Sequence, residues 1–241
     1  METQLKNPLD PVTKALIRKE IEDNFQDFLF EKFWKELFYF STFFESIDGW
    51  SLLNTGITSG ILSTSVRLIT GSTTGQASGI SKLPETVDGL FTYNEVSGFR
   101  SSFILGVAAG NNSAVEFSIG IGSCISANSA TVKHYGFRLV NSTLYGVVGN
   151  GSTETLVTVL TGIAVDTIYE IEARLYSGRK AVFSVSDGNN KKLKERGAIN
   201  RELPVGDITV SWIEIQIKTT ENAPKEVFID HFEYIQHRPK F

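Results

Sequence analysis

Two glutamates of this chain come nearest to the chemistry of a hydrolytic site. Glu170 and Glu172 lie two positions apart in an alternating run, so an extended strand would point both carboxylates to one face. Retaining glycoside hydrolases need two carboxyl groups about 5–5.5 Å apart. A second acidic pair, Asp230 and Glu233, is three positions apart, and a regular strand would point these side chains to opposite faces. We interpret these carboxylates as solvating groups on strand surfaces and expect no catalytic residue.

Other nucleophiles and metal ligands are sparse. The chain has three histidines, His134, His231 and His237, and one cysteine, Cys124, which stands in no recognised pattern with a histidine. One cysteine excludes an internal disulfide and a multi-cysteine zinc site, so we expect Cys124 to be a small core residue. The sequence contains no Gly-x-x-x-x-Gly-Lys-[Ser/Thr] phosphate loop and no Gly-x-Ser-x-Gly motif. It therefore predicts neither a metal nor a cofactor.

The balance of charges argues against nucleic acid as a partner. The chain carries a formal net charge of −4 and has an isoelectric point near 5.5, so it lacks the basic surface that neutralises phosphates. Hydrophobic residues make up 41% of the chain, which is typical of a globular domain with a real core. The longest apolar runs fall short of the ~18 residues of a spanning helix, and the N-terminus has no apolar secretion signal. We expect no transmembrane segment and no secretion.

Residues 1–42 have the pattern of a helical arm. Asp10 can cap a helix and Pro11 suits its first turn, and the next glycine or proline is Gly49. Between them apolar residues recur at helical spacing, with charged residues filling the gaps. These apolar residues are Ile17, Ile21, Phe25, Phe28, Leu29, Phe33, Leu37 and Phe40.

The second half of this predicted helix is apolar on more than one face. Phe30, Trp34 and Phe38 form a further row at four-residue spacing, whereas a surface helix of a monomer needs only one apolar stripe. Either the same domain covers both stripes or another subunit covers one of them, and a helix lying on a membrane surface is a third interpretation. The residues predicted to make anchoring or oligomer contacts are Phe25, Phe28, Phe30, Phe33, Trp34, Leu37 and Phe38.

From Gly49 onward the pattern changes to short β-strands. Runs rich in Val, Ile, Thr, Phe and Tyr alternate with clusters of Gly, Ser and Asn, and helical crossovers are lacking. Residues 43–241 are therefore predicted to form a mainly β domain, an antiparallel β-sandwich or jelly roll, with 187–204 as a solvated loop. The expected strands are 65–70, 76–81, 100–107, 114–120, 133–140, 143–148, 154–160, 169–176, 181–186, 207–218 and 227–236.

Several of these runs resemble the concanavalin A-like lectin/glucanase jelly rolls, especially those in structural proteins of tailed viruses and prophages. The densest match is residues 135–151, in which a strand and a tight turn lead to Leu-Tyr-Gly-Val-Val-Gly-Asn-Gly. Residues 180–185 resemble a hairpin strand of the superfamily, and 227–235 resemble its terminal strand. Residues 44–50 match its usual first strand, where a tryptophan packs at the end of the sandwich. The resemblance covers residues 43–238, and the order of the motifs carries it.

The resemblance implies a fold but not an activity. Glucanases of this superfamily carry Glu-x-Asp-x-x-Glu on one strand, whereas the run from Glu170 and Glu172 continues with Arg174 and Leu175. Legume-type lectins hold calcium and manganese with clustered acidic and amide side chains, but the turn at 187–190 is acidic only once. Both departures favour a protein that is not an enzyme and has no metal.

A sugar-binding surface is the remaining expectation from the resemblance. Aromatic faces flanked by hydrogen-bonding groups bind sugars, and Tyr135, Arg138 and Tyr145 lie on adjacent strands where the resemblance is densest. The alternative is that these three side chains cover the core or its rim.

The preferred hypothesis is a non-enzymatic structural protein of a virion, either capsid decoration or a tail or fibre component. Its jelly roll would mediate assembly or surface recognition, and its arm would bind other virion proteins. By analogy with viral proteins we expect a homo-oligomer, in particular a trimer, located in the virion after assembly in the host cytoplasm. The alternative is a lectin-like module that binds a host-surface glycan, and a glycoside hydrolase is the least favoured hypothesis.

Overall fold

Fifteen strands make up the part of the chain that the computed structural model describes. This part comprises residues 37–43, 50–53, 59–62, 65–82, 92–106, 112–122, 131–188, 193–208 and 213–237. The strands are β1 (Leu37–Phe43), β2 (Ser51–Leu52), β3 (Ser59–Leu62), β4 (Ser65–Ile69), β5 (Ala77–Lys82), β6 (Ser97–Leu105), β7 (Val115–Gly122), β8 (Lys133–Val140), β9 (Thr143–Asn150), β10 (Glu154–Thr161), β11 (Ile168–Tyr176), β12 (Lys180–Asp187), β13 (Leu193–Ile199), β14 (Ile213–Thr219) and β15 (Glu226–His237). The strands predicted from the sequence correspond to β4–β12, β14 and β15.

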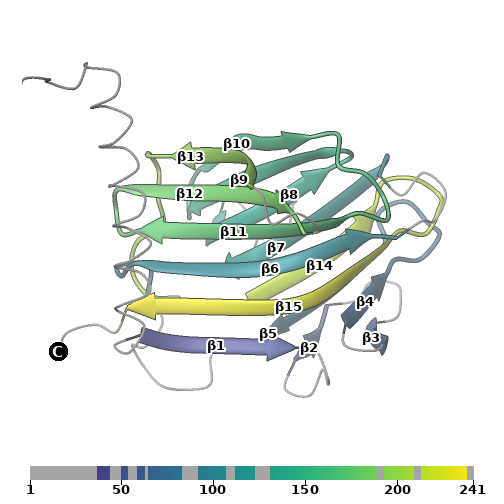
Figure 1. Cartoon of the computed structure of the whole chain (residues 1–241), viewed down its shortest axis with the longest axis horizontal. Helices are drawn as coiled ribbons and strands as arrows, with labels where there is room; N and C mark the ends of the chain where they lie inside the picture. The colour runs from purple at the N-terminus through teal and green to yellow at the C-terminus, as the bar shows by residue number, and fades with distance from the viewer. Residues whose placement is uncertain are drawn as a thin grey trace, which may run out of the picture. The chain divides into compact units, whose positions relative to one another are not determined.

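The strands form two sheets that pack face to face as a sandwich (Figure 1). The eight-stranded sheet has the order β13-β12-β11-β6-β15-β4-β3, and β1 also pairs with β15. The seven-stranded sheet has the order β10-β9-β8-β7-β14-β5-β2. Every pairing whose register is described is antiparallel. The predicted antiparallel β-sandwich is thereby confirmed.

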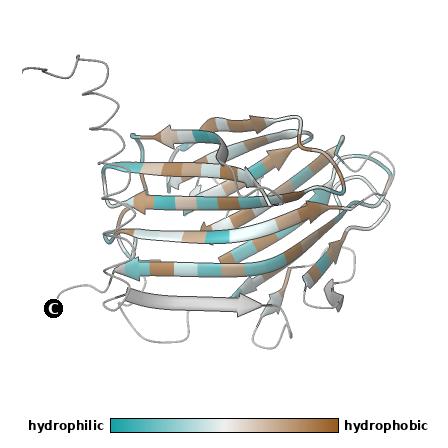
Figure 2. Cartoon of the chain, in the orientation of Figure 1, coloured by the Kyte–Doolittle hydropathy of each residue, from teal (hydrophilic) through white to brown (hydrophobic). Residues whose placement is uncertain are grey.

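Alternation along the strands separates the core from the outer face of each sheet. In β11, Ile171, Ala173 and Leu175 are buried, while Glu170 and Glu172, which alternate with them, are half-buried. The neighbouring strands show the same alternation of hydrophobic and hydrophilic residues (Figure 2). Because side chains of a strand point alternately to its two faces, the apolar set fills the sandwich and the polar set lies outside.

Aromatic rings join the two sheets across the core. Phe103 of β6 lies 5.1 Å from Phe117 of β7, and Phe137 of β8 lies 5.5 Å from Phe183 of β12, measured between ring centroids. Each such pair contributes about 0.5–1.5 kcal/mol beyond the burial of its area. A Cβ added at Gly146 would lie 2.3 Å from the Phe183 ring, so the glycine of the Leu-Tyr-Gly motif gives this ring its space.

Residues 37–42, expected to end the N-terminal helix, form most of strand β1 instead. The run Leu-Phe-Tyr-Phe-Ser-Thr-Phe is rich in aromatic residues, which favour strands as well as buried helix faces. Strand β4 pairs with only the first residues of β15, from Glu226 to Ile229, and the rest of that edge is open to β1. Tertiary pairing thus overrides the helical spacing. The rest of the predicted arm, residues 1–36, lies outside the described residues, as do 44–49 and Cys124.

The predicted loop at 187–204 contains a strand, β13, at the edge of the eight-stranded sheet. It pairs with β12 from Ala181 opposite Ile199 to Ser186 opposite Leu193. Charged residues such as Glu195 and Arg196 are exposed on it, and among residues 195–199, whose burial is described, Gly197 and Ile199 are buried. Natural edge strands carry such charges because they discourage pairing with another chain, and the same charges hide the strand pattern in the sequence.

Candidate ligand-binding groove

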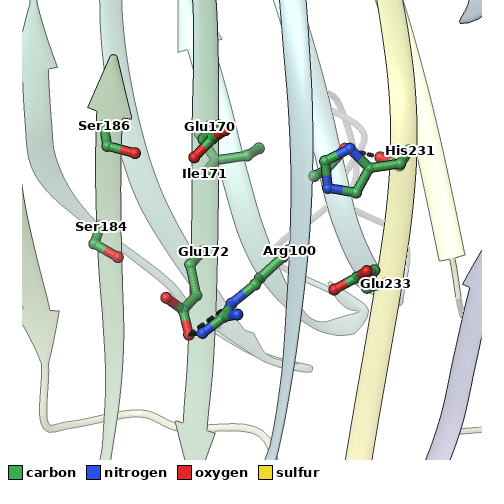
Figure 3. Close-up of a pocket in the computed structure, with 9 residues that line it drawn as sticks. Arg100, Glu170, Ile171, Glu172, Ser184, Ser186, His231 and Glu233 are labelled. Atoms are coloured by element: carbon green, nitrogen blue, oxygen red, sulfur yellow. Dashed lines mark hydrogen bonds and ion pairs between the residues drawn. The ribbon is translucent and has the colours of Figure 1, made fainter. Parts of the chain in front are cut away.

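A groove of about 430 Å³ lies on the outer face of the eight-stranded sheet. Four adjacent strands, β12, β11, β6 and β15, supply its walls and floor (Figure 3). The residues that line it are mainly polar: Arg100, Ser101, Glu170, Ile171, Glu172, Ser184, Ser186, His231 and Glu233. Side chains on paired strands keep their spacing, so the strand pairing sets the positions of the groove residues.

The strand register aligns these side chains in two rows. In the first row Ser184, Glu172, Arg100 and Glu233 stand opposite one another on successive strands. In the second row Glu170 stands between Ser186 and Ser102. Directly opposite residues of antiparallel strands have Cβ atoms about 4.5–5.5 Å apart, which explains how residues far apart in sequence meet here.

Glu172 is held by two arginines. Its Oε1 atom accepts a hydrogen bond from the Arg174 Nε–H and lies 3.4 Å from the Arg100 guanidinium. The Arg100 side chain is 46% exposed, so this ion pair contributes at most about 1 kcal/mol after screening by solvent. Figure 3 shows the Glu172 carboxylate beside the Arg100 guanidinium within the groove.

Glu170 differs from Glu172 although the two residues share one strand face. Among the residues that the structure describes, none forms a hydrogen bond or ion pair with the Glu170 carboxylate. The side chain is half-buried and lines the groove. Glu170 is therefore a hydrogen-bond acceptor left available to a ligand.

A β-bulge brings His231 to the groove. The register between β15 and β6 shifts between Ile229 and Phe232, both of which are buried, so Asp230 and His231 together stand outside the core. The Ser101 hydroxyl donates to the His231 carbonyl oxygen at 2.6 Å, and Ser102 Oγ lies 3.2 Å from His231 Nδ1.

The bulge also corrects an expectation from the sequence. Asp230 and Glu233 were expected on opposite faces because a regular strand has a period of two. The additional residue at the bulge shifts that period, and both side chains lie on the outer face of the sheet. His231 and Glu233 consequently line the same groove.

The predicted sugar-binding residues do not share one surface. Tyr135 is fully buried in the core, where its hydroxyl lies 2.9 Å from Ser97 Oγ. Arg138 and Tyr145 stand opposite each other on the outer face of the seven-stranded sheet. Arg138 is 8% exposed and forms a two-point ion pair with Glu154. The structure thus separates Tyr135 from the other two residues, for which a binding role stays a prediction.

The groove residues were missed because their partners come from distant strands. Glu170 and Glu172 stood out in the sequence as a pair on one face, but nothing there places Arg100 or His231 beside them. Of the predicted anchor residues, Leu37 and Phe38 lie in β1, and Phe25, Phe28, Phe30, Phe33 and Trp34 lie outside the described residues. Within the described ranges there is no group of three side chains placed to hold a metal ion. The same ranges contain no helix long and apolar enough to cross a bilayer.

Comparisons with known proteins define the class of the fold. No family model matches the chain, and no curated protein matches it. Among solved structures, a protein of unknown function from Shewanella oneidensis MR-1 is similar with a TM-score of 0.60 and 15% identity, covering 85% of this chain and 90% of the other. The exoplasmic/lumenal domain of VIP36 bound to Ca²⁺ and Man2 is similar with a TM-score of 0.59 and 12% identity, covering 86% and 92%.

A third similar structure comes from a bacterial virus. The CBM2 module of the evolved Dit of Lactobacillus casei BL23 phage J-1 has a TM-score of 0.55 and 12% identity, covering 86% of this chain and 99% of the module. At these identities the likeness shows the fold alone. The chain has a lectin-like β-sandwich of the concanavalin type, which confirms the coarser part of the resemblance read from the sequence.

Proposed function

We propose that this chain is a non-enzymatic, glycan-binding module of a tailed-virus particle and that it binds a host-surface sugar in the groove of the eight-stranded sheet. The groove itself carries the proposal. It presents carboxylate, guanidinium, imidazole and hydroxyl groups from four paired strands, and sugars are recognised by several such hydrogen bonds at once. Because the strands fix these groups in advance, binding costs little conformational entropy.

Similar structures support a sugar as the ligand. VIP36 was crystallised with Man2, with mannose and with Man3GlcNAc, and it shares the concanavalin-type sandwich of this chain. The phage Dit module, named CBM2, has the same fold. We carry sugar binding over to this chain because one outer sheet face holds a groove lined mainly by polar residues.

The placement in a virus particle is supported by two observations. The order of the strand motifs resembles jelly rolls of tailed-virus structural proteins, and one similar structure is a module of a phage Dit protein. In this proposal other virion proteins are the assembly partners, and the chain acts as a homo-oligomer. Tail or capsid genes beside the gene for this chain are the expected result, and flanking genes of unrelated metabolism would contradict the virion role.

The contacts of the groove carboxylates support the non-enzymatic part of the proposal. Glycoside hydrolysis needs two carboxyl groups that flank the same glycosidic bond. Arg174 and Arg100 both contact the Glu172 carboxylate. Of the two carboxylates that β11 presents to the groove, Glu172 is therefore less available than Glu170 to act on a glycosidic bond. Hydrolysis of a bound glycan by the pure protein would refute this part of the proposal.

A glycan array probed with the full chain tests sugar binding. We expect reproducible binding to one class of glycans, and loss of that binding in a Glu170→Ala, Arg100→Ala double variant. Tyr145→Ala is the matched control, because Tyr145 lies on the outer face of the other sheet. If Tyr145→Ala abolishes binding while the double variant binds normally, the site is on the seven-stranded sheet and the groove assignment is wrong.

A further inference from the structure

The groove has an excess of negative charge. Three carboxylates, Glu170, Glu172 and Glu233, line it against one guanidinium, Arg100, which is a net charge of −2 with His231 neutral. Just beyond the lining, Arg174 pairs with Glu172, Arg196 of β13 stands opposite Ser184, and Asp230 lies beside His231. These three neighbours add one positive charge, so the sum stays negative at −1. A ligand therefore meets a negative surface, although a groove built only to bind hydroxyl groups needs no net charge.

Within this groove Glu170 is the one lining carboxylate whose contacts, among the described residues, include no hydrogen bond or ion pair. Its neighbours across the strands are Ser186 and Ser102, whose small side chains leave the carboxylate accessible from the groove. A half-buried carboxylate has lost part of its water and gains from a donor that also carries positive charge. An ammonium group supplies three such donors and no acceptor.

Arg100 does not offset this preference. Its guanidinium lies 3.4 Å from Glu172, and Glu233 stands opposite it on the other neighbouring strand. In Figure 3 the Arg100 side chain extends toward Glu172 across the floor of the groove. An acidic ligand would have to compete with Glu172 for Arg100 while lying beside Glu170, and like charges in such proximity oppose binding.

We infer that the glycan bound in this groove carries free amino groups, with an ammonium group paired to Glu170, and that uronic-acid, sulfated and phosphorylated glycans are rejected. The inference rests on the proposed function, because it names the class of sugar for the same groove. An exposed or half-exposed ion pair contributes up to about 1 kcal/mol, which corresponds to about fivefold in affinity.

Three oligosaccharides of equal length test the charge preference. A glucosamine hexamer carries free amines, and its N-acetylated counterpart has the same backbone without charge; an oligogalacturonate of six units is the acidic probe. Titration calorimetry of the full chain at low salt should show about fivefold tighter binding of the amine form than of the acetylated form. The preference should decline as sodium chloride is added, since salt screens exposed charges. The acidic oligomer should bind most weakly.

Variants assign the preference to one carboxylate. Glu170→Gln should remove the preference for the amine form, so that the amine and acetylated hexamers bind with equal affinity. Glu116→Gln is the matched control, because it makes the same change in net charge on β7 of the other sheet, where Glu116 pairs with Lys218. Equal losses in both variants would mean attraction by the overall charge of the protein and would overturn the inference.

The remaining outcomes separate this inference from the proposed function. Equal or tighter binding of the acetylated hexamer would overturn the amine preference and leave glycan binding standing. Binding to array glycans that lack amines, with neither hexamer bound, would overturn it as well. Absence of binding to every glycan on the array would refute the proposed function itself.

Discussion

The Ser101 hydroxyl donates a 2.6 Å hydrogen bond to the carbonyl oxygen of His231, at the point where the pairing of β6 with β15 is interrupted. Ser101 is 1% exposed, so the donor is shielded from water. A bulge disrupts the ladder of backbone hydrogen bonds, and a side-chain donor at that place compensates for the disruption. Ser101 thereby stabilises the backbone geometry that presents His231 to the groove.

Ser101→Ala is expected to lower the free energy of unfolding by about 1–2 kcal/mol, because the His231 carbonyl loses a buried donor. The variant should also bind the glycan more weakly, since the bulge that positions His231 is less constrained. Chemical denaturation and calorimetric titration measure the two effects. Ser78→Ala is the control: Ser78 is equally buried, but its hydroxyl has no hydrogen-bond partner among the described residues. It should leave stability unchanged or raise it, and a loss as large as that of Ser101→Ala would contradict the account.

Gly146→Ala is expected to destabilise the sandwich by about 1–3 kcal/mol, the usual effect of overpacking a core. The added methyl would lie 2.3 Å from the Phe183 ring, and both residues are enclosed between the sheets. Thermal and denaturant unfolding measure the loss. Adding Phe183→Leu should restore part of the stability, because it removes the ring atoms that the methyl meets. Strict additivity of the two changes would mean that the contact with Phe183 is not the cause.

The sequence predicted the sandwich well because alternation is a local signal. In β11 the apolar and polar positions separate cleanly, and the same separation holds in the structure. It failed where a neighbour decides the conformation. Strand β1 depends on the open edge of β15, and the exposed charges of β13 reflect its place at a sheet edge.

The groove needs information that spacing along the chain does not contain. Arg100 and Glu172 are 72 positions apart, and only the register of β6 with β11 places them opposite each other. The Asp230–His231 bulge likewise depends on Ser101, 130 positions away from His231. A rule of period two therefore assigned Asp230 and Glu233 to different faces, whereas the bulge puts both on one.

Tyr234→Phe is expected to flatten the loss of stability at alkaline pH. Burial raises the pKa of the Tyr234 phenol above its usual value of 10.0. The contribution of the neutral phenol is thus fully present below pH 10 and is lost as the pH rises through the folded-state pKa. Unfolding free energies measured from pH 8 to 11 should fall less steeply in the variant. At neutral pH the loss of its hydrogen bond to Gln236 should cost about 1 kcal/mol, since Gln236 Oε1 still accepts from the Thr92 N–H. Parallel pH profiles would contradict the role of Tyr234.

Glu172→Gln is expected to weaken the charge preference of the groove with little effect on folding. Arg174 and Arg100 both contact the Glu172 carboxylate, so a neutral amide there leaves two guanidinium charges uncompensated. An acidic oligogalacturonate should then bind several-fold more tightly than to the unchanged protein, and the amine-bearing hexamer more weakly. The unfolding free energy should change by less than about 1 kcal/mol, because the pair with Arg100 is exposed to solvent.

Glu170→Gln is the informative comparison, because it removes the same charge but releases no arginine. It should lower the affinity for the amine-bearing hexamer without raising the affinity for the acidic oligomer. If both variants bind the acidic oligomer more tightly by the same factor, the net charge of the groove decides which ligand binds, and the Arg100–Glu172–Arg174 arrangement does not.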